Sequence, residues 1–95
     1  MRYLICYDIA DDRKRRRIAK YLEANSIRIQ GSVFLGVFTK QRYMEVRNQL
    51  IDFADIDEED SSDSVYMCPL CDQCWNKRWH IGNGRELEFG EVIVV

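Results

Sequence analysis

The chain has 95 residues, 46% of them hydrophobic and 32% charged, which is typical of one small globular domain that a partner subunit would help to stabilise. No stretch approaches the roughly 18 apolar residues of a membrane-spanning helix, and no secretory signal precedes the first predicted strand, so we expect a cytoplasmic protein without a membrane span. The net charge of −2 conceals an uneven distribution of charge. Residues 1–50 contain 11 Lys/Arg and 5 Asp/Glu, whereas residues 51–95 contain 3 Lys/Arg and 11 Asp/Glu. This asymmetry predicts a local basic surface.

The first half of the chain contains clear strand and helix signals. The apolar run before Asp8 predicts a strand over residues 2–8 that is covered on both faces. Asp11 and Asp12 supply an N-cap and favourable charge for a helix over about 12–24. On that helix, the pattern places Ile18 and Leu22 toward the core and most of the cations on the other side.

The remaining segments complete the predicted order. Residues 27–30 and 33–38 form two strands or one long bent strand, with Gly31-Ser32 between them. Thr39 caps a second helix over about 40–54, and an acidic connection follows up to Asp63. A further strand begins at Ser64 and ends near Cys68, where Pro69 limits it.

This order predicts an α+β fold. Strand, helix, strand, strand, helix, strand is the βαββαβ order of a ferredoxin-like domain. The run Val92–Val95 is an extra C-terminal strand, and it needs a sheet edge to pair with. We therefore expect a single domain over 1–95, with a core of about 1–80 and a segment of about 85–95 for dimer or partner contacts.

Asp8 is the first candidate functional residue. It stands where a carboxylate leaves the edge of the sheet, although Asp is also common in turns for local hydrogen bonding. Mg²⁺ usually takes one or two protein carboxylates together with waters and phosphate oxygens. A two-fold homodimer would supply two carboxylates from this one position, and the bound ion would support cleavage of a phosphodiester. Asp11 and Asp12 are possible outer ligands, but capping already explains at least one of them.

A block of cations follows Asp8. The run 13–17 with Lys20 would place cations beside the Asp8 edge, suited to phosphate contacts, whereas its plain interpretation is a solvated helix face. Arg28 on the adjacent strand would extend that surface. Phe34 is either core packing, the commoner fate of a strand aromatic, or a stacking contact for an unpaired base.

The cysteines form a second pattern. Cys68, Cys71 and Cys74 give the spacing C-x-x-C-x-x-C, with His80 beyond them. Zinc sites usually join two separated ligand pairs, so this crowded run disfavours zinc and favours reduced structural thiols. We assign no role to His80.

Several of these segments together resemble one family. The resemblance is carried by residues 3–9, by Asp11-Asp12 with the basic helix, and by residues 28–30 and 32–36. Pro69-Leu70-Cys71 with Cys74 also matches many members. The chain resembles the small CRISPR-associated endoribonucleases or endonucleases that form the dimeric subunit of the spacer-acquisition complex.

The resemblance implies a ferredoxin-like homodimer in which Asp8 binds a divalent metal, Mg²⁺ or another ion, near the two-fold axis. It implies that the C-terminal strand lies across the partner protomer and helps to dock the CRISPR integrase subunit. Gly31 departs from the larger residue that is frequent in relatives. The positions that match residues linked to nuclease activity in some relatives are Tyr7, Arg15, Arg17, Arg28 and Phe34.

Two functions remain open at this point. The first is a Mg²⁺-dependent homodimeric endonuclease of the spacer-acquisition stage that cleaves RNA or DNA. The second is a non-catalytic homodimer that holds duplex DNA and bridges integrase subunits during spacer integration. The expected catalytic residues are Asp8, which also binds the metal, with Tyr7, Arg15, Arg17, Arg28 and Phe34; the expected nucleic-acid contacts are Arg13, Lys14, Arg16 and Lys20.

Overall fold

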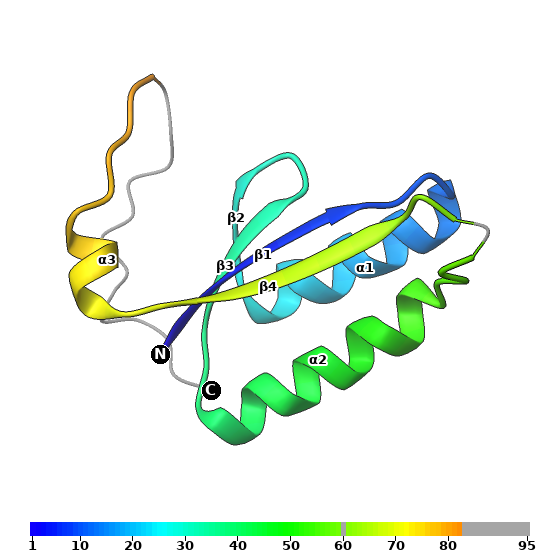
Figure 1. The fold of residues 1–95 in the computed structure, drawn as a ribbon, viewed down its shortest axis with the longest axis horizontal. Coiled ribbons are helices and arrows are strands. Elements are labelled where there is room, and N and C mark those ends of the chain that lie inside the picture. Colours follow the sequence, from blue (N-terminus) through cyan, green and yellow to red (C-terminus); the bar gives the residue numbers. More distant parts are fainter. Residues whose placement is uncertain (60, 83–95) are drawn as a thin grey trace.

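The computed structural model describes residues 1–59 and 61–82, and Figure 1 shows how their helices and strands are arranged. The elements in chain order are β1 (Arg2–Asp8), α1 (Asp12–Asn25), β2 (Ile27–Gln30), β3 (Val33–Val37), α2 (Lys40–Ala54), β4 (Ser64–Leu70) and α3 (Asp72–Asn76). The predicted C-terminal strand lies outside the described residues. No described helix is long and apolar enough to cross a membrane.

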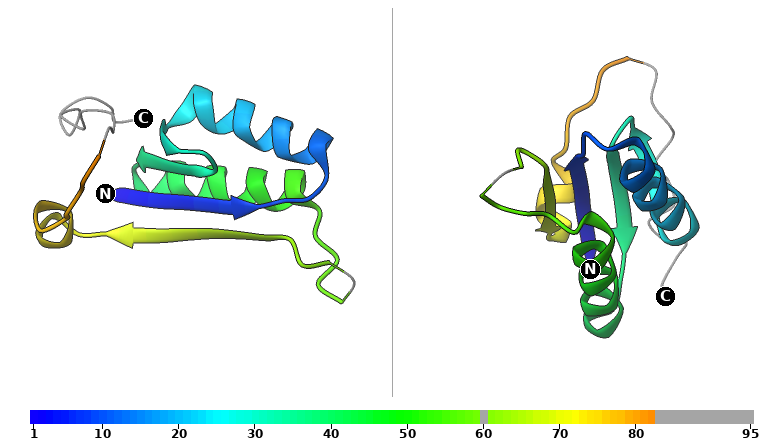
Figure 2. Two further views of the ribbon diagram at one scale, coloured as in Figure 1. Left: turned by 90° about the horizontal axis from the view of Figure 1, so that it is seen from above. Right: turned by 90° about the vertical axis from the view of Figure 1, so that its right-hand side faces the viewer.

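The four strands form one antiparallel sheet in the order β2-β3-β1-β4. The helices α1 and α2 lie side by side on one face of this sheet (Figure 2). This arrangement confirms the predicted α+β, ferredoxin-like βαββαβ order. Because α1 returns the chain from the end of β1, its first turn lies beside that end of the strand (Figure 1), and Asp8 is the last residue of β1.

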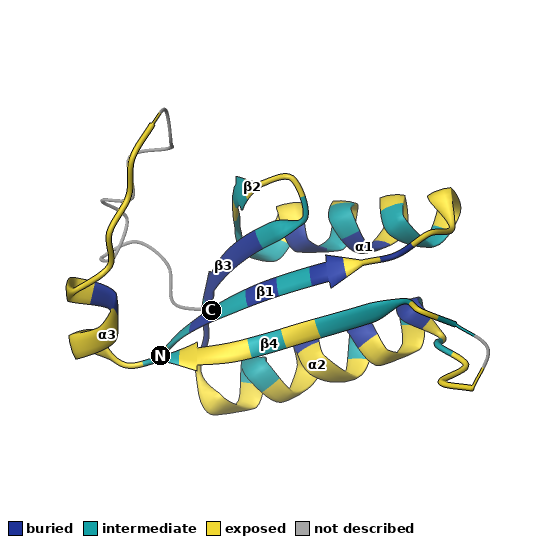
Figure 3. Ribbon diagram, turned by 45° about the horizontal axis from the view of Figure 1, so that its top comes forward, coloured by how far each residue is buried: buried dark blue, intermediate teal, exposed yellow. Residues whose placement is uncertain are grey.

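The core lies between the sheet and the two helices. Alternate residues of β1 point into it, so Tyr3, Ile5 and Tyr7 are buried. Ile18 and Leu22 of α1 meet them from the helical layer, as the helical spacing predicts, together with the α2 residues Val46 and Leu50. Figure 3 colours the buried residues dark blue, and they recur along β1, β3 and the two helices.

The opposite face of the sheet is not covered by any described helix or strand (Figure 2). The prediction that β1 is covered on both faces is therefore wrong for the described part of one chain. Leu4 and Cys6 of β1 are half-buried there, and Tyr66 of β4 is 65% exposed. Val33 and Val37 of β3 lie on the same face, because they pair with Cys6 and Arg2. We call this surface the open face.

Two features near the end of β4 differ from expectation. The strand does not stop before Pro69 but continues to Leu70, with Pro69 opposite Tyr3. β4 is an edge strand of the described sheet, and proline is tolerated there because its missing N–H can face the unpaired side of the strand.

The short helix α3 was not predicted. Its buried residue Trp75 packs its ring against the guanidinium groups of Arg2, at 5.3 Å, and Arg78, at 3.8 Å.

Candidate functional site

Asp8 is the last residue of β1 and is exposed. It lies on the open face, because side chains alternate along a strand and Leu4 and Cys6 point the same way. Its strand neighbour on β4 is Ser64. Within the described part of the chain, no hydrogen bond or ion pair engages the Asp8 carboxylate. It is therefore available to a ligand.

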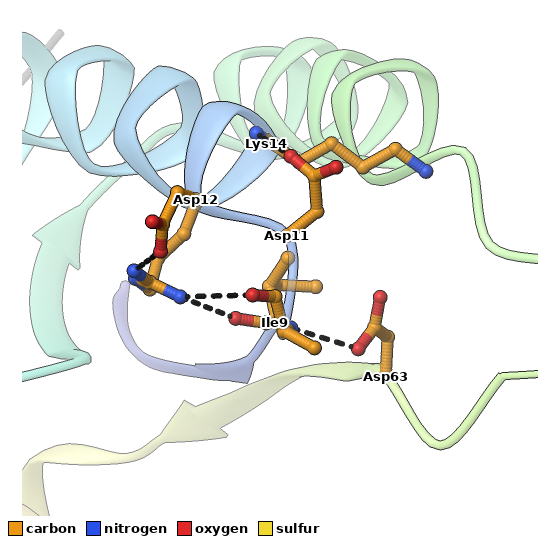
Figure 4. A network of polar contacts seen from close by, with 7 residues as sticks. Ile9, Asp11, Asp12, Lys14 and Asp63 are labelled. Carbon is orange, nitrogen blue, oxygen red and sulfur yellow. Dashed lines mark hydrogen bonds and ion pairs between the residues drawn. The ribbon is translucent and has the colours of Figure 1, made fainter.

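The loop that follows Asp8 is held in place by Arg15 and Asp63 (Figure 4). The Arg15 guanidinium donates to the carbonyl oxygens of Ile9, at 3.0 Å, and Ala10, at 3.2 Å. The backbone N–H of Ala10 donates to Asp63 Oδ1 at 3.0 Å. Arg15 therefore reaches the end of β1, as predicted, but its hydrogen bonds position the loop rather than leave the whole guanidinium free for a phosphate.

The other carboxylates near this edge are engaged. Asp11 caps α1 by accepting the backbone N–H of Lys14 at 2.9 Å, and Asp12 forms an ion pair with Arg15. Asp63 accepts from Ala10. No group of three His, Cys, Asp or Glu side chains among the described residues is placed to hold a metal ion. Of these four carboxylates, Asp8 is the one that no described residue engages.

The Asp11 cap gives a testable pH dependence. The backbone N–H of Lys14, followed by weaker contributions from Arg13 and the Lys14 charge, holds the pKa of Asp11 below its usual range. Ionised Asp11 therefore stabilises the fold above its ordinary pKa, and this stabilisation is lost as the pH falls through the lowered value. Asp11→Ser keeps a capping oxygen that does not titrate.

We expect wild type to lose more stability than Asp11→Ser when the pH is lowered from neutral through the carboxyl range. Asp11→Ala, which has no capping oxygen, should be the least stable of the three at neutral pH. Urea unfolding at a series of pH values measures both effects. The same acid dependence in wild type and Asp11→Ser would contradict this role for the Asp11 carboxylate.

Apart from Arg15, the cations of α1 divide into two groups. Arg13, Arg16 and Lys20 are exposed and form no ion pair within the described residues. Lys14 instead donates through Nζ to the carbonyl oxygen of Asp55 at 3.2 Å, and Arg17 lies over the Phe53 ring at 5.7 Å. The first group is the surface that we call the basic face of α1.

Three further predicted site residues form a cluster of their own. Phe34 is fully buried and stacks on Tyr7, which is 6% exposed, with ring centroids 6.2 Å apart. The Arg28 guanidinium lies 4.9 Å from the Phe34 ring and 3.5 Å from the carboxylate of Glu23. This cluster lies on the helix-covered side of the sheet, so the structure does not bring it together with Asp8. Tyr7 and Phe34 serve the core, which supports the packing interpretation of Phe34.

The sequence contained a signal for this separation, because Tyr7 and Asp8 are neighbours on one strand and must face opposite ways. Sequence reasoning missed Asp63. Its contact with Ala10 joins residues 53 positions apart, and no local pattern predicts such a contact.

A groove of about 590 Å³ runs between α2 and β4. Apolar side chains line most of it, among them Leu50, Ile51, Val65 and Met67. It borders the outer edge of β4, which is unpaired among the described strands. The groove holds none of the predicted site residues.

Comparison with known proteins identifies close similarity to one family. The family model described as CRISPR-associated protein Cas2 matches residues 1–78. A CRISPR-associated endoribonuclease Cas2 of Rhodospirillum rubrum is 36% identical over 81 residues, which is 85% of this chain and 62% of that protein. A CRISPR-associated endoribonuclease Cas2 of Chloroflexus aurantiacus is 32% identical over 95 residues, which is 100% of this chain and 99% of that protein.

Solved structures have the same fold. Streptococcus pyogenes Cas2 aligns with a TM-score of 0.70 at 24% identity, covering 86% of this chain and 100% of that one. A chain of a partial Cas6-RT-Cas1–Cas2 complex aligns with a TM-score of 0.72 at 25% identity, covering 84% of this chain and 83% of that one.

Proposed function

Because the chain belongs to the CRISPR-associated Cas2 family, we propose that it is a homodimeric, metal-dependent endonuclease of the spacer-acquisition stage that cleaves phosphodiester bonds in RNA or DNA. The observation that carries this proposal is the position of Asp8. It is an exposed carboxylate without a partner in the described residues, beside a basic helix and on the open face of the sheet.

The open face supports a second copy of this chain as the partner. A sheet face that carries Leu4, Cys6 and Tyr66 needs another layer to remove its apolar surface from water. Asp8 lies on the same face, at its end. Each residue of an isologous interface occurs twice, so a two-fold axis that passes close to this end of the open face would place the two copies of Asp8 near one another.

The donor set fits a hard divalent cation such as Mg²⁺. One carboxylate from each of two chains matches the one or two protein carboxylates that Mg²⁺ usually takes, with waters and phosphate oxygens filling the other positions. When bound, such an ion lowers the pKa of water and stabilises charge on the phosphodiester. The Arg15 and Asp63 contacts keep the loop after Asp8 fixed, so that the carboxylate is positioned before substrate arrives.

The basic face of α1 supplies the substrate contact in this proposal. Arg13, Arg16 and Lys20 begin within a few residues of Asp8 and are free to meet backbone phosphates. They carry no base information, so the proposed binding is independent of sequence. The roles of Arg17 and Arg28 at phosphate remain predictions.

A cleavage assay tests the proposal. The purified full chain is incubated with labelled single-stranded RNA or double-stranded DNA while Mg²⁺ is titrated, with a chelator as the control. Cleavage of either substrate that requires the metal is the expected result. Cleavage that persists in the chelator would contradict a metal-dependent site. Duplex binding without cleavage, under all metals and pH values tried, would favour the scaffold function described below.

Tyr66→Lys tests the dimer surface. Tyr66 is already 65% exposed in one chain, so the substitution should leave the fold intact, whereas two buried copies of the new charge would disrupt packing through the open face. We expect wild type to be a dimer and Tyr66→Lys a monomer at micromolar concentration. Light scattering after size exclusion measures this difference.

Met44→Lys is the matched control, because Met44 is also an exposed large apolar residue but belongs to the helical layer. It should remain dimeric. A dimer of unchanged stability in Tyr66→Lys would show that the open face is not the interface.

A non-catalytic scaffold is the second candidate, and the basic face of α1 favours it, because exposed cations hold duplex DNA whether or not it is cut. The partner in this function is the CRISPR integrase subunit, and a relative of known structure belongs to a complex that contains Cas1. The outer edge of β4, which pairs with no other described strand, and the apolar groove beside it are suited to an extended segment such as the predicted C-terminal strand. A cytoplasmic location is part of the proposal, because the exposed thiols of Cys68, Cys71 and Cys74 suit a reducing compartment.

A further inference from the structure

The function proposed above leaves the cysteines without a role. All four are free thiols. Cys6 lies on β1 and Cys68 on β4, whereas Cys71 is the N-cap of α3 and Cys74 lies within that helix. Because α3 follows the end of β4 that pairs with Arg2, it lies at the opposite end of the sheet from Asp8 (Figure 1).

Cys71 and Cys74 are directly in contact. An N-cap side chain faces the residue three positions later, and here the backbone N–H of Cys74 donates to Cys71 Sγ at 3.4 Å. The neighbouring Cys74 thiol also acts on the pKa of Cys71. The Cys71 sulfur is therefore held against the backbone of Cys74, and both residues are exposed to solutes.

Cys6 and Cys68 do not form an equivalent pair. In the β1–β4 register Cys68 is opposite Leu4, and Cys6 is opposite Tyr66, so the two cysteines are diagonal neighbours. Diagonal positions in a sheet are about 7–8 Å apart, beyond the roughly 4.4–6.8 Å that usually separates the Cα atoms of a disulfide. Cys71 and Cys74, by contrast, are joined by a hydrogen bond, and this contact places them to react together.

The two thiols of the pair differ chemically. The backbone hydrogen bond from Cys74, and then the hydrogen bond from its thiol, lower the pKa of Cys71. The same thiol contact and the charge of Cys71 raise the pKa of Cys74. Cys71 is therefore the first to become a thiolate, and the thiolate is the nucleophilic form.

We infer that Cys71 and Cys74 form a redox-active dithiol that low-molecular-weight disulfides oxidise to an intramolecular disulfide. The Cys71 thiolate attacks one sulfur of the small disulfide, which forms a mixed disulfide and releases one small thiolate. Cys74 then loses its proton and attacks the Cys71 sulfur, which releases the second small thiolate. The small disulfide gains two electrons, and the two cysteines lose two electrons and two protons, so the reaction balances.

The arrangement supports thiol exchange better than metal binding. A structural zinc site needs four ligands, and two thiolates provide half of them. No third His, Cys, Asp or Glu in the described ranges completes a cluster with this pair. The inference does not depend on the nuclease proposal, because it concerns a different end of the sheet and a different reaction.

The experiment uses the reduced full chain and oxidised glutathione as the probe. After mixing, the remaining thiols are alkylated with a chelator present, and the peptides are analysed by mass spectrometry over time. Wild type should form a Cys71–Cys74 disulfide. Cys74→Ser should accumulate a glutathione adduct on Cys71. In Cys71→Ser the thiol of Cys74 remains, and its adduct should form roughly tenfold more slowly than the Cys71 adduct does in Cys74→Ser.

Cys68→Ser is the matched control, because it removes an exposed thiol from the same run but leaves the pair intact. It should form the disulfide at the wild-type rate. Glutathione adducts on Cys71 and Cys74 without an intramolecular disulfide would overturn the inference, as would a disulfide to Cys68 or Cys6. Faster reaction at Cys74 than at Cys71 would overturn the order of attack. The wild-type result decides the pairing even if a variant fails to fold.

Discussion

Asp8→Asn is expected to reduce metal-dependent cleavage by roughly two to three orders of magnitude, the loss that follows removal of one direct contact to a transition state. The substitution replaces the carboxylate in both chains of a homodimer. The metal would therefore lose the negative charge of both of its protein ligands. Asp8 is exposed and has no described hydrogen bond, and the fold should therefore tolerate Asn at this position.

The measurement is a single-turnover cleavage rate across a Mg²⁺ titration, with metal binding followed in parallel by calorimetry. Asp52→Asn is the matched control, since it makes the same chemical change at an exposed position of α2. It should cut at the wild-type rate. Equal cleavage by Asp8→Asn and wild type would remove Asp8 from the site and point to a contaminant or to other residues.

Phe34→Ala is expected to lower the free energy of unfolding by about 3–5 kcal/mol, the cost of deleting a buried aromatic ring. Phe34 is fully buried, stacks on Tyr7 and carries the Arg28 guanidinium over its outer surface, so the cavity would lie at the centre of several contacts. This cost is a large fraction of the roughly 5–15 kcal/mol that stabilises a small domain. Urea unfolding at one fixed protein concentration measures it, because a dimer's stability depends on concentration.

Phe34→Leu separates packing from base stacking. Leu keeps most of the apolar volume, so we expect a smaller loss of stability than in Phe34→Ala and a cleavage rate close to wild type. If Phe34 instead stacks on a base, Phe34→Leu should lose cleavage, because Leu has no aromatic face for a base. Loss of cleavage by a stably folded Phe34→Leu would therefore return Phe34 to the catalytic residues.

The signals that predicted the fold correctly are local ones. Asp11 and Thr39 cap the helices α1 and α2 as expected, because an N-cap bonds to a backbone N–H three residues away in the chain. The position of Asp8 at the end of β1 followed from the apolar run before it. Helical spacing likewise identified the core side chains of α1 and α2.

The sheet's two faces show what a local pattern leaves undecided. The apolar run of β1 suggested cover on both sides, but Leu4 and Cys6 face a surface that no described element of the same chain covers. A strand's composition reports that its faces are apolar, and it does not report whether the second layer comes from the same chain or from another copy.

The amino-acid sequence by itself determined the βαββαβ order, the caps of α1 and α2, the basic helix after Asp8 and the resemblance to the Cas2 family. These depend on neighbours in the chain, where sequence distance and spatial distance agree. Only the tertiary structure decided that Arg15 and Asp63 fix the loop after Asp8, that Arg28 lies over Phe34 away from that carboxylate, and that α3 brings two thiols into contact. The Asp63 contact joins residues 53 positions apart, and it depends on how β4 pairs with β1. The others join near neighbours in the chain, but they depend on where the loop after β1, the β2–β3 pairing and the turn into α3 place the side chains.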